Sequence, residues 1–103
     1  MKVKVNILHT PYGPLVTICD PELIGRRLEQ DRIVFEISSF YDGREIDDKD
    51  IDESLLKEAH CIHAVGKKSI EVVKRAGLVK EGDVKVFQEV PIVIIFNVQK
   101  ILC

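Results

Sequence analysis

The chain opens with an alternation of apolar and polar positions. Val3, Val5 and Ile7 are each separated by one polar residue, which is the period of a strand with one buried face. A Pro-Tyr-Gly-Pro turn at 11–14 follows, and the segment 15–19 is apolar and β-branched. The pattern predicts an N-terminal hairpin of two antiparallel strands.

A short helix is expected after this hairpin. Asp20 is a suitable N-cap, Pro21 fits the first helical position, and Glu22 favours the positive end of the helix dipole. The helix is expected to end near Asp31. In the segment 33–37, Ile33, Phe35 and Ile37 lie on one side of an extended chain, and Val34 and Glu36 lie on the other. This segment is therefore predicted to be a middle strand.

Two consecutive helices are predicted in the second half. Asp50 and Glu53 have the spacing of a capping box, and an apolar stripe at helical spacing continues from there to Ile62. Gly66 interrupts this pattern. A second helical pattern then runs to Gly77, a residue suited to the left-handed position that ends a helix.

The segments 84–87 and 92–98 are rich in β-branched residues, and the nearly continuous apolar run of the second predicts a central strand buried on both faces. The fold class is therefore α+β. A mixed sheet of about five strands (the N-terminal hairpin, one middle strand and two C-terminal strands) is expected to pack against about three helices. One domain should span 1–103.

Composition limits the class of protein. Apolar residues make up 46% of the chain and charged residues 31%, a globular balance. The longest apolar stretch, 90–96, is far shorter than the roughly 20 residues of a membrane-spanning helix, and the N-terminus does not resemble a signal peptide. The three cysteines, Cys19, Cys61 and Cys103, form no disulfide pattern. We expect a cytoplasmic protein without membrane contact.

Charge is distributed unevenly. The segment 45–53 contains six acids and one base, whereas the net charge of the whole chain is −2, so the other 94 residues carry +3. An acidic segment on a mildly basic body is compatible with one basic face. It also makes the segment a candidate docking site for a basic protein partner.

Short motifs spread over most of the chain occur in a recognisable order. They are Cys19-Asp20, Glu22-Leu23-Ile24-Gly25-Arg26, Tyr41-Asp42-Gly43, Ala59, Val65-Gly66, Ala76-Gly77-Leu78 and Val90-Pro91. Together they resemble the archaeal family catalogued as domain of unknown function 424. The resemblance implies an archaeal cytoplasmic protein of about this size, with no established activity to transfer. Two positions depart from the family pattern, which has an asparagine at His63 and a polar residue, often histidine, at Ile92.

Metal and nucleotide motifs fail at named positions. His60 and His63 would share one helix face, but two ligands do not make a zinc site. The segment beginning at Gly66 has Lys68 where a nucleotide-binding loop requires a hydroxyl residue. A calcium loop would require glycine and glutamate where Glu53 and Ala59 stand. We expect no bound metal and no cofactor.

The start of the helix predicted after Gly66 is the best candidate for binding an anion. A helix N-terminus offers free backbone donors, and lysines flank this one. The candidate anion- or RNA-binding residues are Gly66, Lys67, Lys68, Ser69, Arg26 and Arg27. A solvated basic face is the competing interpretation, since Glu71 can pair with Lys67 or Arg75. The first hypothesis is a non-catalytic module that binds RNA or a ribonucleoprotein.

Two alternatives remain open, and the oligomeric state is not determined by the sequence. The first alternative is a protein-interaction adaptor that uses the acidic segment 45–53. The second is a small cysteine-dependent enzyme, because Cys19 precedes an expected helix N-terminus that would lower its thiol pKa. A buried cysteine at a strand end is the competing interpretation of Cys19.

Overall fold

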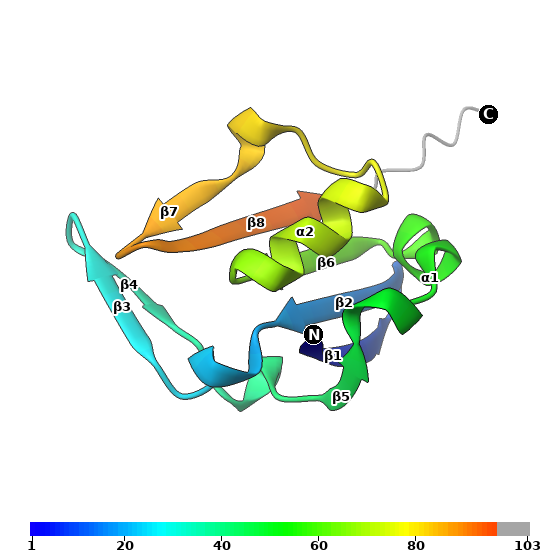
Figure 1. Cartoon of the computed structure of the whole chain (residues 1–103), viewed down its shortest axis with the longest axis horizontal. Helices are drawn as coiled ribbons and strands as arrows, with labels where there is room; N and C mark the ends of the chain where they lie inside the picture. Colours follow the sequence, from blue (N-terminus) through cyan, green and yellow to red (C-terminus); the bar gives the residue numbers. More distant parts are fainter. Residues whose placement is uncertain (97–103) are drawn as a thin grey trace.

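The computed structural model describes residues 1–96, and its centre is a six-stranded mixed sheet (Figure 1). The strand order is β5-β1-β2-β6-β8-β7. β2 and β6 are parallel, and the other neighbours are antiparallel. The strands are β1 (Lys2–Thr10), β2 (Gly13–Cys19), β5 (Arg44–Asp47), β6 (Cys61–Val65), β7 (Lys85–Phe87) and β8 (Val90–Phe96).

A second, two-stranded sheet and two α-helices complete the fold. The small sheet pairs β3 (Arg27–Gln30) with β4 (Ile33–Glu36). The helices are α1 (Glu53–Glu58) and α2 (Lys67–Arg75), and four 3-10 turns are η1 (Pro21–Leu23), η2 (Ser39–Tyr41), η3 (Asp48–Asp50) and η4 (Glu81–Asp83). The predicted α+β class is confirmed. The main sheet has six strands rather than five, and the described residues form two α-helices rather than three.

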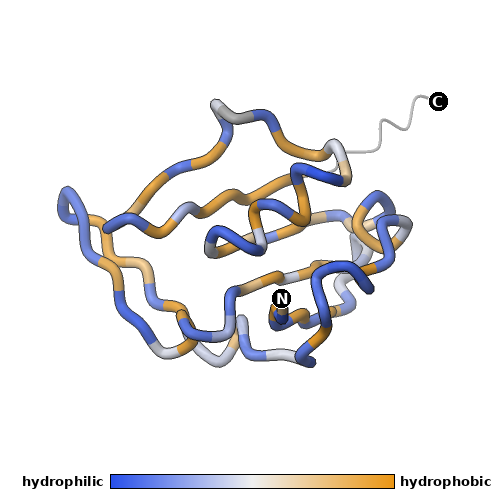
Figure 2. The backbone as a smooth tube through the Cα atoms, in the orientation of Figure 1, coloured by the Kyte–Doolittle hydropathy of each residue, from blue (hydrophilic) through white to orange (hydrophobic). Residues whose placement is uncertain are grey.

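The sheet separates two apolar clusters. α1 and α2 cover one face, where Val16, Ile18 and Ile62 are fully buried beneath them. On the other face, the β3–β4 hairpin and the loop around η2 enclose Leu28 and Ile37. Figure 2 shows the corresponding pattern, with hydrophobic residues along the sheet strands and hydrophilic residues at the hairpin tips. No helix within residues 1–96 has the length and apolar character needed to cross a membrane.

The helix predicted from Asp20 to Asp31 is wrong. Its start signals produce one turn, η1, after which Gly25 adopts a positive φ of 91° and the chain enters β3. The backbone groups of this segment bond across to Ile37 instead: the Gly25 N–H donates to the Ile37 carbonyl at 2.7 Å, and the Ile37 N–H donates to the Arg26 carbonyl at 2.8 Å. The middle strand predicted at 33–37 forms as β4, but it pairs within the small sheet.

The long helix predicted from Asp50 to Ile62 is also wrong in extent. α1 covers six residues, and its N-cap is Asp52, whose carboxylate accepts from the Ser54 N–H at 2.9 Å. The segment from Cys61 is β6, inserted between β2 and β8. Pairing on both sides overrides the helical spacing of its apolar residues, so the two helices are not consecutive.

The predictions for the last third are closer to the structure. α2 forms where it was expected, and Gly77 has the predicted positive φ, 74°. β8 is an interior strand, and its first half is buried on both faces, with Ile92 in one cluster and Val93 in the other. The predicted burial is wrong for its end, because Ile94 and Phe96 are 45% and 66% exposed. Residues 97 and 98 of that prediction lie outside the described residues.

Candidate functional site

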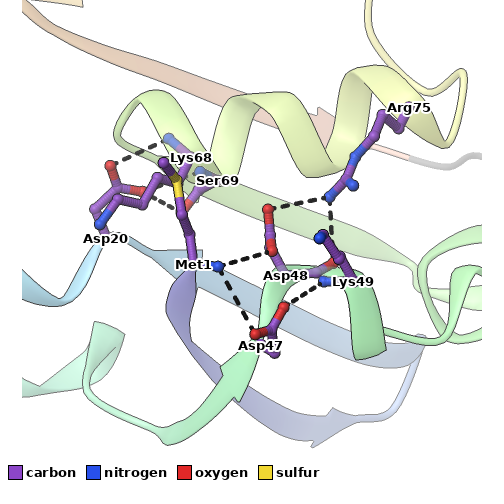
Figure 3. Close-up of polar contacts among 8 residues, drawn as sticks. All are labelled: Met1, Asp20, Asp47, Asp48, Lys49, Lys68, Ser69 and Arg75. Atoms are coloured by element: carbon purple, nitrogen blue, oxygen red, sulfur yellow. Dashed lines mark hydrogen bonds and ion pairs between the residues drawn. The ribbon is translucent and has the colours of Figure 1, made fainter.

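The N-terminus of α2 is capped by a carboxylate from a distant part of the chain (Figure 3). Asp20 Oδ2 accepts from the Lys68 N–H at 3.2 Å, and Oδ1 accepts from the Ser69 N–H at 2.9 Å and the Ser69 hydroxyl at 2.8 Å. Asp20 is 4% exposed. Its negative charge therefore lies in low-dielectric surroundings at the positive end of the helix dipole.

Gly66 makes this close approach possible. Its φ of 104° is accessible to glycine and strained for other residues, and a Cβ at this position would overlap the carboxyl group of Asp20. The Gly66 N–H donates to the Pro91 carbonyl at 2.8 Å, which ties the helix start to β8. Because the Asp20 carboxylate already accepts from the Lys68 and Ser69 N–H groups, a phosphate site formed by these backbone donors receives no support from the geometry.

Three of the predicted basic residues nevertheless gather beside this helix start. Arg26, Lys67 and Lys68 line a surface hollow of about 340 Å³, together with Leu23, Val90 and Pro91 among others. Arg27 is not among the lining residues, and its guanidinium lies 3.0 Å from Glu29. Ser69 is fully buried behind Asp20.

A second hollow, of about 400 Å³, adjoins the first and shares Lys67 and Pro91 with it. Its other lining residues are Ile70, Glu71, Lys74, Val84 and Val86. The two hollows together are called the α2 groove below. The sequence did not indicate Val84 and Val86 as site residues, because a valine in a strand is ordinarily a core residue. Only the structure shows that the Val86 side chain is 53% exposed.

Charged side chains of both signs line the α2 groove in equal number: Arg26, Lys67, Lys68, Lys74, Asp20, Glu22, Glu71 and Glu89. Two of the acids are engaged, because Asp20 caps α2 and Glu22 lies 3.6 Å from the Lys68 ammonium. Three cations then face two carboxylates. Among the described side chains, no ion pair joins Arg26, Lys67 or Lys74 to an acid, so these cations remain available to a ligand.

Cys19 is fully buried at the end of β2. Burial, followed by the nearby charges of Asp20, Glu22 and Asp42, raises its thiol pKa to about 12. This is opposite to the predicted lowering, because burial dominates the thiol pKa and the expected helix is only a single 3-10 turn, η1. The thiol also donates to the Asp20 carbonyl at 3.4 Å. A buried, protonated thiol is a poor nucleophile.

His60 and His63 do not converge, because they do not lie on a helix. His60 precedes β6 and its ring lies 5.7 Å from that of Tyr12. His63 lies within β6, where Nδ1 is 3.1 Å from the Tyr41 hydroxyl oxygen and burial lowers the histidine pKa. Within residues 1–96, no group of three potential metal ligands comes together.

Among the described side chains, two of the six acids of the segment 45–53, Asp47 and Asp48, form ion pairs within the chain (Figure 3). The amino group of Met1 lies 3.3 Å from Asp48 and 3.7 Å from Asp47. Arg75 lies 3.5 Å from Asp48, rather than pairing with Glu71. A hydrogen bond from the Lys49 N–H is the main reason that the pKa of Asp47 is lowered. These contacts reduce the charge that this segment offers to a basic partner.

Comparisons with known proteins identify relatives without an assigned activity. A family model described as "Protein of unknown function (DUF424)" matches residues 8–98. The crystal structure of an uncharacterized conserved protein from the archaeon Methanopyrus kandleri is similar, with a TM-score of 0.79 and 26% sequence identity over 99% of this chain and 98% of that chain. No curated protein matches.

Proposed function

The chain belongs to the DUF424 family of proteins of unknown function, and we propose that it is a non-catalytic module whose α2 groove binds RNA. The observation that carries this proposal is a set of three cations, Arg26, Lys67 and Lys74, that form no ion pair among the described side chains and that line the α2 groove together with apolar residues. Lysine and arginine contacts to phosphates supply most of the sequence-independent affinity for nucleic acids.

Binding is favoured over catalysis by the state of the reactive groups. Cys19 is buried with a raised thiol pKa, and the two histidines of the 60–63 segment have separate neighbours. Nucleophilic catalysis requires a nucleophile and a base within hydrogen-bond reach. The adaptor alternative is less well supported, because Asp47 and Asp48 already pair with Met1 and Arg75.

Fluorescence anisotropy with a labelled mixed-sequence RNA tests the proposal. The groove variant Lys67→Gln/Lys74→Gln is compared with Lys49→Gln/Lys80→Gln, which removes the same charge from exposed positions outside the groove. We expect the groove variant to bind RNA on the order of tenfold more weakly at low salt. The slope of log K against log salt concentration should become less steep by about 1.4, because two phosphate contacts are lost.

Two results would overturn the proposal. One is the absence of RNA binding by the wild-type protein at about 25 mM salt, where phosphate contacts are strongest. The other is an equal loss of affinity in the groove variant and in the Lys49/Lys80 control, since this would indicate a general charge effect.

A further inference from the structure

We propose that the α2 groove takes one unstacked nucleotide of a single-stranded RNA, with its base in the hollow lined by Val84 and Val86 and its phosphate in the hollow lined by Arg26. This inference rests on the proposed RNA binding and adds which form of RNA is bound, and how. Lys67 lies where the two hollows meet.

The two hollows differ in the chemistry of their walls. The larger is lined by Ile70, Val84, Val86 and Pro91 together with three charged residues, Lys67, Glu71 and Lys74. The smaller contains two cations, Arg26 and Lys67, that form no ion pair among the described side chains, and three acids. Asp20 caps α2 and Glu22 lies 3.6 Å from Lys68, which leaves Glu89 beside the two cations. A nucleotide has the same two parts, a flat and largely apolar base and a charged phosphate, joined through a sugar.

Burial of the base is the contact that a nucleotide makes in the groove and that a polyanion without bases cannot make. Val86 is 53% exposed although it lies in a sheet strand, so a ligand that covers it gains hydrophobic contact. Bases removed from a stack are commonly held between aromatic or apolar side chains. Val86, Val84 and Ile70 supply such surfaces here.

A duplex does not fit this mode. In A-form RNA the bases are paired and stacked, and the deep, narrow major groove is closed to side chains. The apolar hollow would then remain empty, and only the phosphate contacts of Lys67, Lys74 and Arg26 would contribute. Single-stranded segments have bases that can be splayed out and inserted.

The test compares three labelled ligands of equal length: a single-stranded RNA, the same strand with abasic residues, and its duplex. Each is titrated against the wild-type protein, Val86→Ala, and the control Val34→Ala, which truncates another exposed strand valine outside the α2 groove (46% exposed). Because both valines are exposed, both variants are expected to fold, and thermal unfolding verifies it.

We expect the intact single strand to bind best and Val86→Ala to weaken its binding about fifteenfold, the effect of removing two methyl groups from a buried contact. The salt dependence should not change, since no phosphate contact is lost. Val34→Ala should bind like the wild type. The abasic strand should be insensitive to Val86→Ala.

The failure of this inference is distinguishable from the failure of RNA binding itself. If the duplex and the abasic strand bind as tightly as the intact strand, and Val86→Ala binds like the wild type, the groove contacts phosphates alone and the base-insertion inference is wrong. If none of the three ligands binds at low salt, both proposals are wrong.

Discussion

Asp20→Ala tests the central contact of the fold, the carboxylate that caps α2 from outside the helix. The substitution removes an acceptor of three hydrogen bonds and leaves the Lys68 and Ser69 backbone donors without it. It also removes a negative charge from the positive end of the helix dipole. Because Asp20 is 4% exposed, water replaces these contacts poorly.

The expected loss is larger than that of an ordinary cap. Replacing an exposed N-cap by alanine costs about 0.5–2 kcal/mol, whereas hydrogen bonds to a charged group contribute about 1.5–3 kcal/mol each and are not additive. We therefore expect Asp20→Ala to lower the free energy of unfolding by about 3 kcal/mol. That is a large share of the roughly 5–15 kcal/mol that stabilises a small domain.

Urea unfolding followed by circular dichroism measures this loss, and the control is Asp52→Ala. Asp52 is the exposed N-cap of α1 and accepts one hydrogen bond, from the Ser54 N–H at 2.9 Å. It should cost about 1 kcal/mol. The loss for Asp20→Asn should lie between those for Asp20→Ala and Asp52→Ala. The asparagine amide retains one acceptor oxygen but turns an NH₂ group toward the second backbone donor.

A double-mutant cycle with Gly66→Ala identifies the cause. The added methyl group collides with the Asp20 carboxyl group, so Gly66→Ala should cost less in the Asp20→Ala background than in the wild type. What remains is the strain of a non-glycine residue at φ 104°. Equal losses for Asp20→Ala and Asp52→Ala, or additive effects of Asp20→Ala and Gly66→Ala, would refute the assigned contact.

Three further predictions concern residues away from the groove. Thr17 Oγ1 is buried without a hydrogen-bond partner among the described residues, so Thr17→Val should raise the free energy of unfolding by about 1 kcal/mol in urea titrations. Arg32 has a φ of 69°, so Arg32→Gly should stabilise by about 0.5 kcal/mol, whereas Glu29→Gly within β3 should destabilise. Burial lowers the pKa of His63, so below about pH 6.5 the unfolded chain binds the proton more readily and stability falls. Replacing His63 by asparagine should flatten that part of a stability profile measured from pH 8 to 5.

Local sequence signals predicted the elements that depend on local interactions. The N-terminal hairpin needs one turn, and α2 needs an apolar stripe and the glycine that ends it at Gly77. β6 was missed because its neighbours, β2 and β8, come from distant parts of the chain. The apolar spacing around Ile62 fits a helix as well as a strand, and the pairing on both sides decides between them.

The candidate site was predictable in its residue types but not in its arrangement. Lys67 and Lys68 were indicated by the start of a helix, yet their approach to Arg26 depends on η1, which brings the chain after β2 past the start of α2. Asp20 shows the limit most clearly. The sequence predicts that it caps the segment that directly follows it, but its side chain makes no cap hydrogen bond there and instead caps α2, which begins 47 residues later.

Three of the motifs that carry the family resemblance, Cys19-Asp20, Val65-Gly66 and Val90-Pro91, meet at this same place. Asp20 caps α2, its N–H donates to the Val65 carbonyl at 3.0 Å, and the Gly66 N–H donates to the Pro91 carbonyl at 2.8 Å. These contacts join β2, β6, β8 and α2, so the motifs are explained by the fold without reference to a ligand. Lys74 and Val86, which line the groove beside this junction, lie outside the motifs. The family resemblance therefore specifies this junction and includes one groove cation, Arg26, whereas Lys67, Lys74 and Val86 add groove chemistry that the motifs do not contain.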